Sequence, residues 1–127
     1  MVNCFVLGSG DIFNFEIGAY QNFTQLRKAI WDDNKDYFER IEVDDQELKL
    51  WKVEIYTRNS EKYLEIKNSQ INVDIKQKFG GLKLEPTWKV TKEFPEPPPT
   101  KEHIHIIVQP SPPPPRVSDN FAILFSI

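Results

Sequence analysis

All ten prolines of this 127-residue chain lie at position 86 or later. Proline fixes φ and removes a backbone donor, so it interrupts helices and central strands. The first 85 residues are therefore free to form helices and strands, whereas prolines interrupt regular structure in the rest and favour extended segments. Hydrophobic residues make up 39% of the chain, enough for one modest core. We expect one domain followed by a tail.

The charge balance and the single cysteine exclude several classes of protein. Sixteen basic and nineteen acidic side chains leave a net charge of −3, so no overall basic field favours nucleic acid or an anionic membrane. Cys4 is the only cysteine, which excludes a disulfide scaffold within one chain. No run reaches the ~20 apolar residues that span a bilayer, and the opening segment lacks the basic region of an ordinary secretory signal.

The first half of the chain predicts a β-hairpin followed by one helix. Residues 2–7 are rich in β-forming side chains and residues 11–17 alternate between apolar and polar, which is typical of paired strands. The glycines of 8–11 suit the turn between them. Thr24 is expected to cap a helix that ends near Asn34. The apolar face of this helix consists of Leu26, Ala29 and Ile30.

Three later segments predict further strands. Residues 48–55 form the third strand, whose alternation slips between Leu50 and Trp51, so either a bulge lies there or both faces are covered. Residues 63–66 predict a weak fourth strand, and residues 103–108 a pronounced last one. The two expected faces of the last strand are Ile104, Ile106 and Val108, and His103, His105 and Ile107.

Short helices and extended proline segments are predicted for the remainder. A helix over 73–79 is expected to stop at Gly80, and another is expected to begin at Pro86 and run to residue 94. Residues 95–99 must be extended. Residues 112–115 form a polyproline run, which is interpreted as a stiff linker or as a ligand for a proline-binding module.

This order of elements predicts an α+β protein. Its mixed five-stranded sheet packs on one main helix, with additional short helices. In the β-grasp (ubiquitin-like) arrangement the last strand lies at the centre, parallel to the first and flanked by the third. That position explains why residues 2–7 and 103–108 carry the densest aliphatic runs, because a central strand has neighbours on both edges.

Few side chains suggest catalytic chemistry. His103 and His105 lie two residues apart on a strand, where two rings can share a metal ion, but no Cys, Asp or Glu cluster supplies further ligands. We therefore favour histidines on the sheet surface. Cys4 lies in an aliphatic strand, where burial makes a thiol inert. The pair Gly80-Gly81 lacks the Lys-Ser/Thr of a phosphate loop. The sequence predicts no catalytic residue, no metal site and no cofactor.

Several segments, in the same order, resemble the N-terminal domain of the Crinkler effectors, which are secreted proteins of oomycetes and some fungi. These segments are Cys4–Gly8, Leu26–Ile30, Leu48–Val53, Ile71–Gly81 and Lys101–Pro110. The resemblance covers about residues 2–110. Trp51 replaces the Phe of the oomycete motif, whose Leu-Ala-Lys ending is absent here, so the pattern is more similar to the fungal branch.

The resemblance assigns two motifs of the Crinkler N-terminal domain to two predicted strands. The motif linked to host-cell entry in oomycete members corresponds to Leu48, Leu50 and Trp51. The motif that closes the N-terminal domain begins with His105, Ile106, Ile107 and Val108.

The resemblance implies a ubiquitin-like Crinkler N-terminal domain over residues 1–110, followed by a proline-rich linker and C-terminal tail over 111–127. It implies a non-catalytic part of a secreted effector that serves trafficking or translocation and contacts host proteins. The expected location is the host cell, where such effectors often reach the nucleus. No nucleic-acid partner is expected for this domain.

Partner contact is expected on the sheet. Trp51 and Lys52 on the third strand, with His103 and His105 on the last, are expected to share the exposed sheet face that ubiquitin-like domains often use. The alternative is a homodimer or larger homo-oligomer, formed by pairing sheet edges or by exchanging an apolar segment such as residues 120–125.

Overall fold

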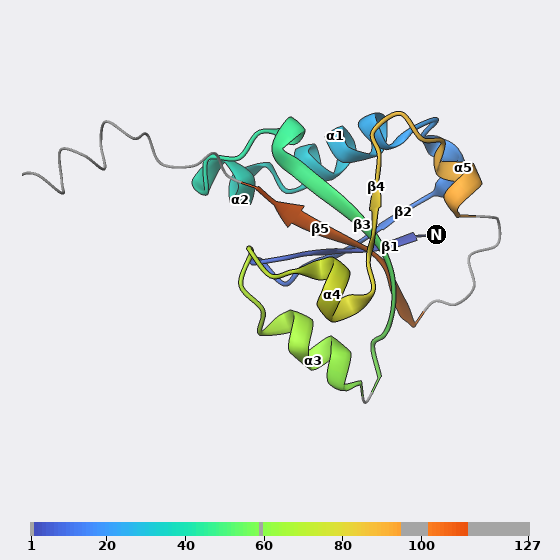
Figure 1. Cartoon of the computed structure of the whole chain (residues 1–127). Helices are drawn as coiled ribbons and strands as arrows, with labels where there is room; N and C mark the ends of the chain where they lie inside the picture. The colour runs from blue at the N-terminus through green and yellow to red at the C-terminus, as the bar shows by residue number, and fades with distance from the viewer. Residues whose placement is uncertain (1, 59, 95–101, 112–127) are drawn as a thin grey trace, which may run out of the picture.

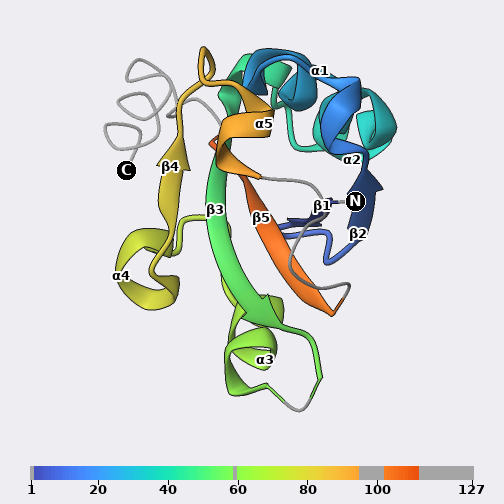
Figure 2. The same cartoon turned by 90° about the vertical axis from the view of Figure 1, so that its right-hand side faces the viewer.

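A five-stranded mixed sheet lies at the centre of the computed structural model, which describes residues 2–58, 60–94 and 102–111. The strand order is β2-β1-β5-β3-β4 (Figure 2). The strands are β1 (Val2–Val6), β2 (Ile12–Phe15), β3 (Leu48–Tyr56), β4 (Leu82–Leu84) and β5 (His103–Pro110). β5 runs parallel to β1 and antiparallel to β3. The predicted α+β class and the central last strand are confirmed, and the order is compatible with a β-grasp fold.

The β1–β2 hairpin forms as predicted. Cys4 of β1 lies opposite Phe13 of β2 in an antiparallel register. Gly8 in the turn has φ 96°, a left-handed conformation that favours glycine. A Cβ atom at Gly8 would collide with the Tyr37 hydroxyl group and lie 2.9 Å from Cγ2 of Ile71. The turn is therefore wedged between two other parts of the chain, and only glycine fits it.

Helices cover both faces of the sheet (Figure 1). One face carries α1 (Phe23–Asp33), α2 (Lys35–Arg40) and α5 (Val90–Glu93), together with the short 3-10 turns Ile17–Ala19 and Asp45–Glu47 nearby in the chain. The opposite face carries α3 (Glu61–Lys67) and α4 (Ile75–Phe79). The result is a three-layer arrangement, rather than a sheet with one helix-covered face and one open face.

The helix α1 begins two residues earlier than the sequence predicts. Asn22, not Thr24, is its N-cap: the Asn22 side-chain oxygen accepts a hydrogen bond from the Gln25 N–H at 3.0 Å. Phe23 is fully buried as the first helical residue, and its burial favours the earlier start. The Thr24 hydroxyl instead donates to the Pro86 carbonyl at 3.0 Å. The predicted end at Asn34 is confirmed.

Residues 63–66 form part of the helix α3, so the predicted weak fourth strand is wrong. The Ser60 hydroxyl oxygen caps this helix by accepting from the Tyr63 N–H at 3.3 Å. Ile66 is buried and Tyr63 half-buried, a spacing of three that suits a helix, whereas Leu64 is 58% exposed. The actual fourth strand is β4, whose three residues carry too little pattern to predict.

The second predicted short helix is also wrong in extent. Residues 86–88 form a turn, and α5 begins only at Val90. The Pro86 carbonyl accepts from the Thr24 N–H at 3.0 Å as well as from its hydroxyl group, which fixes this turn at the start of α1. The first short helix is confirmed: α4 starts after Asp74 and stops at Gly80, whose φ is 64°.

Within the described residues two hydrophobic cores form, one on each face of the sheet. The first core lies under α1, α2 and α5 and includes Phe23, Leu26, Ile30, Phe38, Leu48, Leu50, Ile106 and Val108. The second lies under α3 and α4 and includes Phe5, Leu7, Val53, Ile55, Ile66, Ile75, Ile104 and Ile107. The alternation slip at Leu50 and Trp51 therefore reflects coverage of both faces.

A β-bulge does occur, but further along β3. The register against β5 shifts between Lys52 and Ile55. Across this irregularity Ile104 enters the second core while Ile106 enters the first, so the prediction that these two side chains share a face is wrong.

The expected extended segment 95–99, the polyproline run 112–115 and the tail 117–127 lie outside the described residues.

Candidate interaction groove

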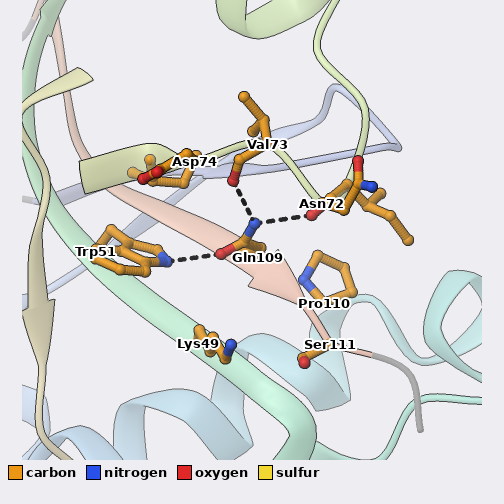
Figure 3. Close-up of a pocket in the computed structure, with 10 residues that line it drawn as sticks. Lys49, Trp51, Asn72, Val73, Asp74, Gln109, Pro110 and Ser111 are labelled. Atoms are coloured by element: carbon orange, nitrogen blue, oxygen red, sulfur yellow. Dashed lines mark hydrogen bonds between the residues drawn. The ribbon is translucent and has the colours of Figure 1, made fainter. Parts of the chain in front are cut away.

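A groove of about 520 Å³ lies at the C-terminal end of β5, between β3 and the loop that precedes α4 (Figure 3). We call it the Trp51 groove. The residues that define it here are Lys49, Trp51, Val73, Asp74, Gln109 and Ser111. Its walls mix an indole ring and aliphatic side chains with one exposed ammonium and one exposed carboxylate group.

Gln109 holds the two walls of the groove together (Figure 3). Its side-chain oxygen accepts from Nε1 of Trp51 at 2.9 Å. Its side-chain nitrogen donates to the carbonyl oxygens of Ile71 at 2.8 Å and Val73 at 2.9 Å. Gln109 is 7% exposed, and these three bonds satisfy an amide that would otherwise be costly to bury. The groove is therefore preformed.

The indole ring of Trp51 is also held from the β4 side. A Cβ atom built on Gly81 would lie 3.3 Å from Cε3 of Trp51 and 2.7 Å from Cγ2 of Ile75. The absence of a side chain at Gly81 thus lets the indole ring and α4 pack closely. Since the indole N–H already bonds to Gln109, the ring offers the groove an apolar surface and no hydrogen-bond donor.

Lys52, the neighbour of Trp51, points to the opposite face of the sheet. Its ammonium group donates to the Glu93 carbonyl oxygen at 2.8 Å and lies 3.5 Å from the Glu93 carboxylate. The same group lies 5.3 Å from the ring centroid of Phe94, in the first core. Lys52 therefore ties α5 to β3.

The two histidines have different surroundings. His105 is 3% exposed, and its Nδ1 accepts a hydrogen bond from the Asn3 backbone N–H at 2.9 Å. His103 is half-buried at the start of β5 and makes an edge contact with Tyr56, with ring centroids 5.1 Å apart. The expectation that Trp51, Lys52 and the histidines share one exposed sheet face is wrong, because helices cover both faces. Whether each contacts a partner stays a prediction.

A polar cluster surrounds the start of β5. The Tyr56 hydroxyl donates to one Glu102 carboxylate oxygen at 2.8 Å, and Nε of Arg58 lies 3.3 Å from the other. The hydrogen bond and the negative charge of Glu102 raise the pKa of Tyr56 above its ordinary value. Because Tyr56 and Arg58 are exposed, this cluster orders the strand end rather than forming a reactive centre.

The positions expected to correspond to the two family motifs lie in β3 and β5. Their side chains are nearly all buried: Leu48, Leu50, His105, Ile106, Ile107 and Val108 are each at most 3% exposed. Trp51 is half-buried and lines the Trp51 groove, whereas Leu48 and Leu50 line a separate hollow of about 240 Å³ beside β4. These positions therefore contribute mainly to the two cores.

The sequence reasoning missed Gln109 and the loop before α4. A Gln placed just after an aliphatic strand was the available signal, because a polar side chain that a central strand buries needs partners. Burial raises the pKa of the Cys4 thiol, consistent with its predicted inertness. Among the described residues no three His, Cys, Asp or Glu side chains are grouped to hold a metal ion. In the same part of the chain, no helix has the length and apolarity needed to cross a membrane.

Comparison with known proteins identifies the family. No curated protein and no solved structure matches this chain. A family model described as the Crinkler effector protein N-terminal domain matches residues 1–109, which is most of the 127-residue chain. These residues include β1, β3 and β5 as far as Gln109, together with both cores. The chain therefore belongs to the Crinkler effector family, through its N-terminal domain.

Proposed function

We propose that this chain is a non-catalytic N-terminal domain of a secreted Crinkler-type effector, which serves trafficking or translocation and binds a host protein inside the host cell, including its nucleus. The observation that carries the proposal is the family match over residues 1–109. We take residues 1–110 as the ubiquitin-like domain and 111–127 as its linker and tail. The engagement of His105 and Cys4 within the core supports a non-catalytic role.

The Trp51 groove is the contact surface that we assign to the host protein. It is concave, it has an apolar indole wall, and exposed charges of both signs lie at its rim on Lys49 and Asp74. An aromatic anchor with a polar rim is the usual composition of a protein-binding site. Lys52 and His105 contact the α5 side of the sheet, and His103 lies at the other end of β5, so none of the three lines the groove.

A pull-down from host-cell extract tests the proposal. The full chain is compared with Trp51→Ala and Lys49→Glu, and Trp88→Ala serves as the matched control because Trp88 is exposed outside the groove. Circular dichroism must confirm that each variant folds. We expect the wild type and Trp88→Ala to retain the same specific host protein, and the two groove variants to lose it. Equal capture by all four chains would reject this surface.

Homo-oligomerisation is the second candidate function. It is favoured by the edge strand β2, where Ile12 is 41% exposed and offers an apolar side chain to a second copy. Light scattering over a range of concentrations measures the mass of wild type and Ile12→Lys. A dimer that Ile12→Lys dissociates would support this candidate, whereas a monomer at every concentration would reject it.

A further inference from the structure

We propose that the apolar part of this chain's own tail, residues 117–125, docks into the Trp51 groove. The inference concerns the same surface as the proposed function but needs no host protein. It makes the groove an internally occupied site that a partner must compete for.

The first observation is where the chain leaves the described structure. Ser111 lines the Trp51 groove, and its N–H donates to the Glu47 carbonyl oxygen at 2.8 Å. The tail is therefore tethered at the rim of the groove. A tethered segment acts at an effective concentration of about millimolar, so even a weak fit is enough to fill a site.

The second observation is the length and order of the tail sequence. Four prolines at 112–115 in a polyproline helix would extend about 12 Å, at about 3.1 Å per residue. Residues 118–120 are Ser-Asp-Asn, which favour a turn. The apolar residues 121–125 follow directly, and five extended residues span about 16 Å. The sequence can therefore return to the groove that it leaves.

The third observation is the chemistry of the two surfaces. The indole face of Trp51 and the Val73 side chain offer apolar area and no indole donor, which suits Phe121 and Leu124 better than a polar ligand. At the rim, Lys49 and Asp74 take part in no ion pair within the described part of the chain. The tail carries one charge of each sign, Arg116 and Asp119, that can complement them.

Paramagnetic broadening in the full chain tests this docking. Ser126→Cys introduces a site for a nitroxide label, and Cys4 does not compete because it is fully buried. We expect the indole N–H signal of Trp51 and the amide signals of Asn72 and Val73 to lose most of their intensity. Amide signals of Thr91 and Lys92, on α5 at a distance from the groove, provide the internal reference.

The matched control keeps the tether and the label but adds Phe121→Ser and Phe125→Ser. Docking predicts that these two changes restore the groove signals. Equal broadening with and without them would mean simple proximity and would overturn the proposal, as would no broadening in the labelled wild-type tail. A sample that mixes isotope-labelled chains without nitroxide and nitroxide-carrying chains without isotope must show no broadening; broadening there would assign the tail to a second copy instead. None of these outcomes depends on host binding, so the pull-down and this experiment fail independently.

Discussion

The Nδ1 atom of His105 accepts a hydrogen bond at 2.9 Å from the backbone N–H of Asn3, so a side chain of the central strand β5 binds the backbone of its neighbour β1. The ring also makes an edge contact with Phe94, with centroids 6.4 Å apart. His105 thus joins the sheet to the α5 end of the first core. The buried ring therefore has a structural role in this strand.

Replacing His105 with Leu should lower the free energy of unfolding by about 1–3 kcal/mol, because the substitution removes a part-buried hydrogen bond from the Asn3 N–H. His105→Asn keeps an acceptor oxygen near the position of Nδ1 and should cost less, although it loses the contact with Phe94. Urea denaturation of both variants measures the difference. If His105→Leu proved the more stable of the two, the hydrogen bond would not be the main contribution of His105.

Replacing Gln109 with Leu should open the groove. The substitution removes the acceptor for the Trp51 indole N–H and the donor for the Ile71 and Val73 carbonyl oxygens. Hydrogen exchange should accelerate in the loop before α4 while the exchange of β1 stays slow. Lys49→Ala, at an exposed site on the same groove, is the control and should leave exchange unchanged. If hydrogen exchange accelerated equally across the whole sheet, the hydrogen bonds of Gln109 would not act locally on this loop.

The adjacent glycines Gly80 and Gly81 should respond to alanine by different mechanisms. Gly80 has φ 64° with open space around it, so Gly80→Ala should cost about 1–2 kcal/mol from backbone strain alone. Gly81→Ala places a methyl group against Ile75 and Trp51, so it should also shift the indole N–H resonance of Trp51. Thermal unfolding and the indole spectrum of each variant check this. An unshifted indole signal in Gly81→Ala would argue against the close packing.

Substitutions at the positions expected to correspond to the entry-linked motif should act through stability. Leu48 and Leu50 are each 3% exposed, so Leu50→Ala should cost about 2–5 kcal/mol. Lys49→Ala, between them and exposed, should cost less than about 0.5 kcal/mol. Unfolding curves and a host-cell uptake assay should rank these variants in the same order. If Lys49→Ala stayed stable but lost uptake, the host cell would recognise the exposed surface of β3 directly, and the effect would not act through stability.

The buried thiol of Cys4 should make stability depend on alkaline pH. Burial raises the pKa of Cys4 in the folded state, so the unfolded chain loses this proton first. The contribution of the protonated thiol to the free energy of unfolding is complete below the pKa of the unfolded chain, about 8.5. Above that pH the contribution falls by at most about 1.4 kcal/mol per pH unit. Cys4→Val removes this dependence, and the difference between the two unfolding curves from pH 7 to about pH 10 measures it. Parallel curves would contradict a protonated thiol in the core.

The sequence predicted the sheet because its central strands have strong local patterns. The aliphatic runs of β1 and β5 and the glycine turn after β1 determined the topology. The helical conformation of residues 63–66 was not predicted. Tyr63 and Ile66 pack into the second core at helical spacing, and this core exists only because helices also cover that face of the sheet. The Trp51 groove escaped prediction because Gln109, Gly81 and the Val73 loop converge from distant parts of the chain.

The parallel pairing of β1 with β5 determines when this domain can fold during synthesis or passage through a pore. Cys4 pairs with Ile106, so the first strand has no inner neighbour until roughly the whole domain has emerged. Contacts so distant in sequence form slowly, since a long loop must close first. A chain that emerges N-terminus first would therefore stay open, and accessible to chaperones, until its final strand arrives.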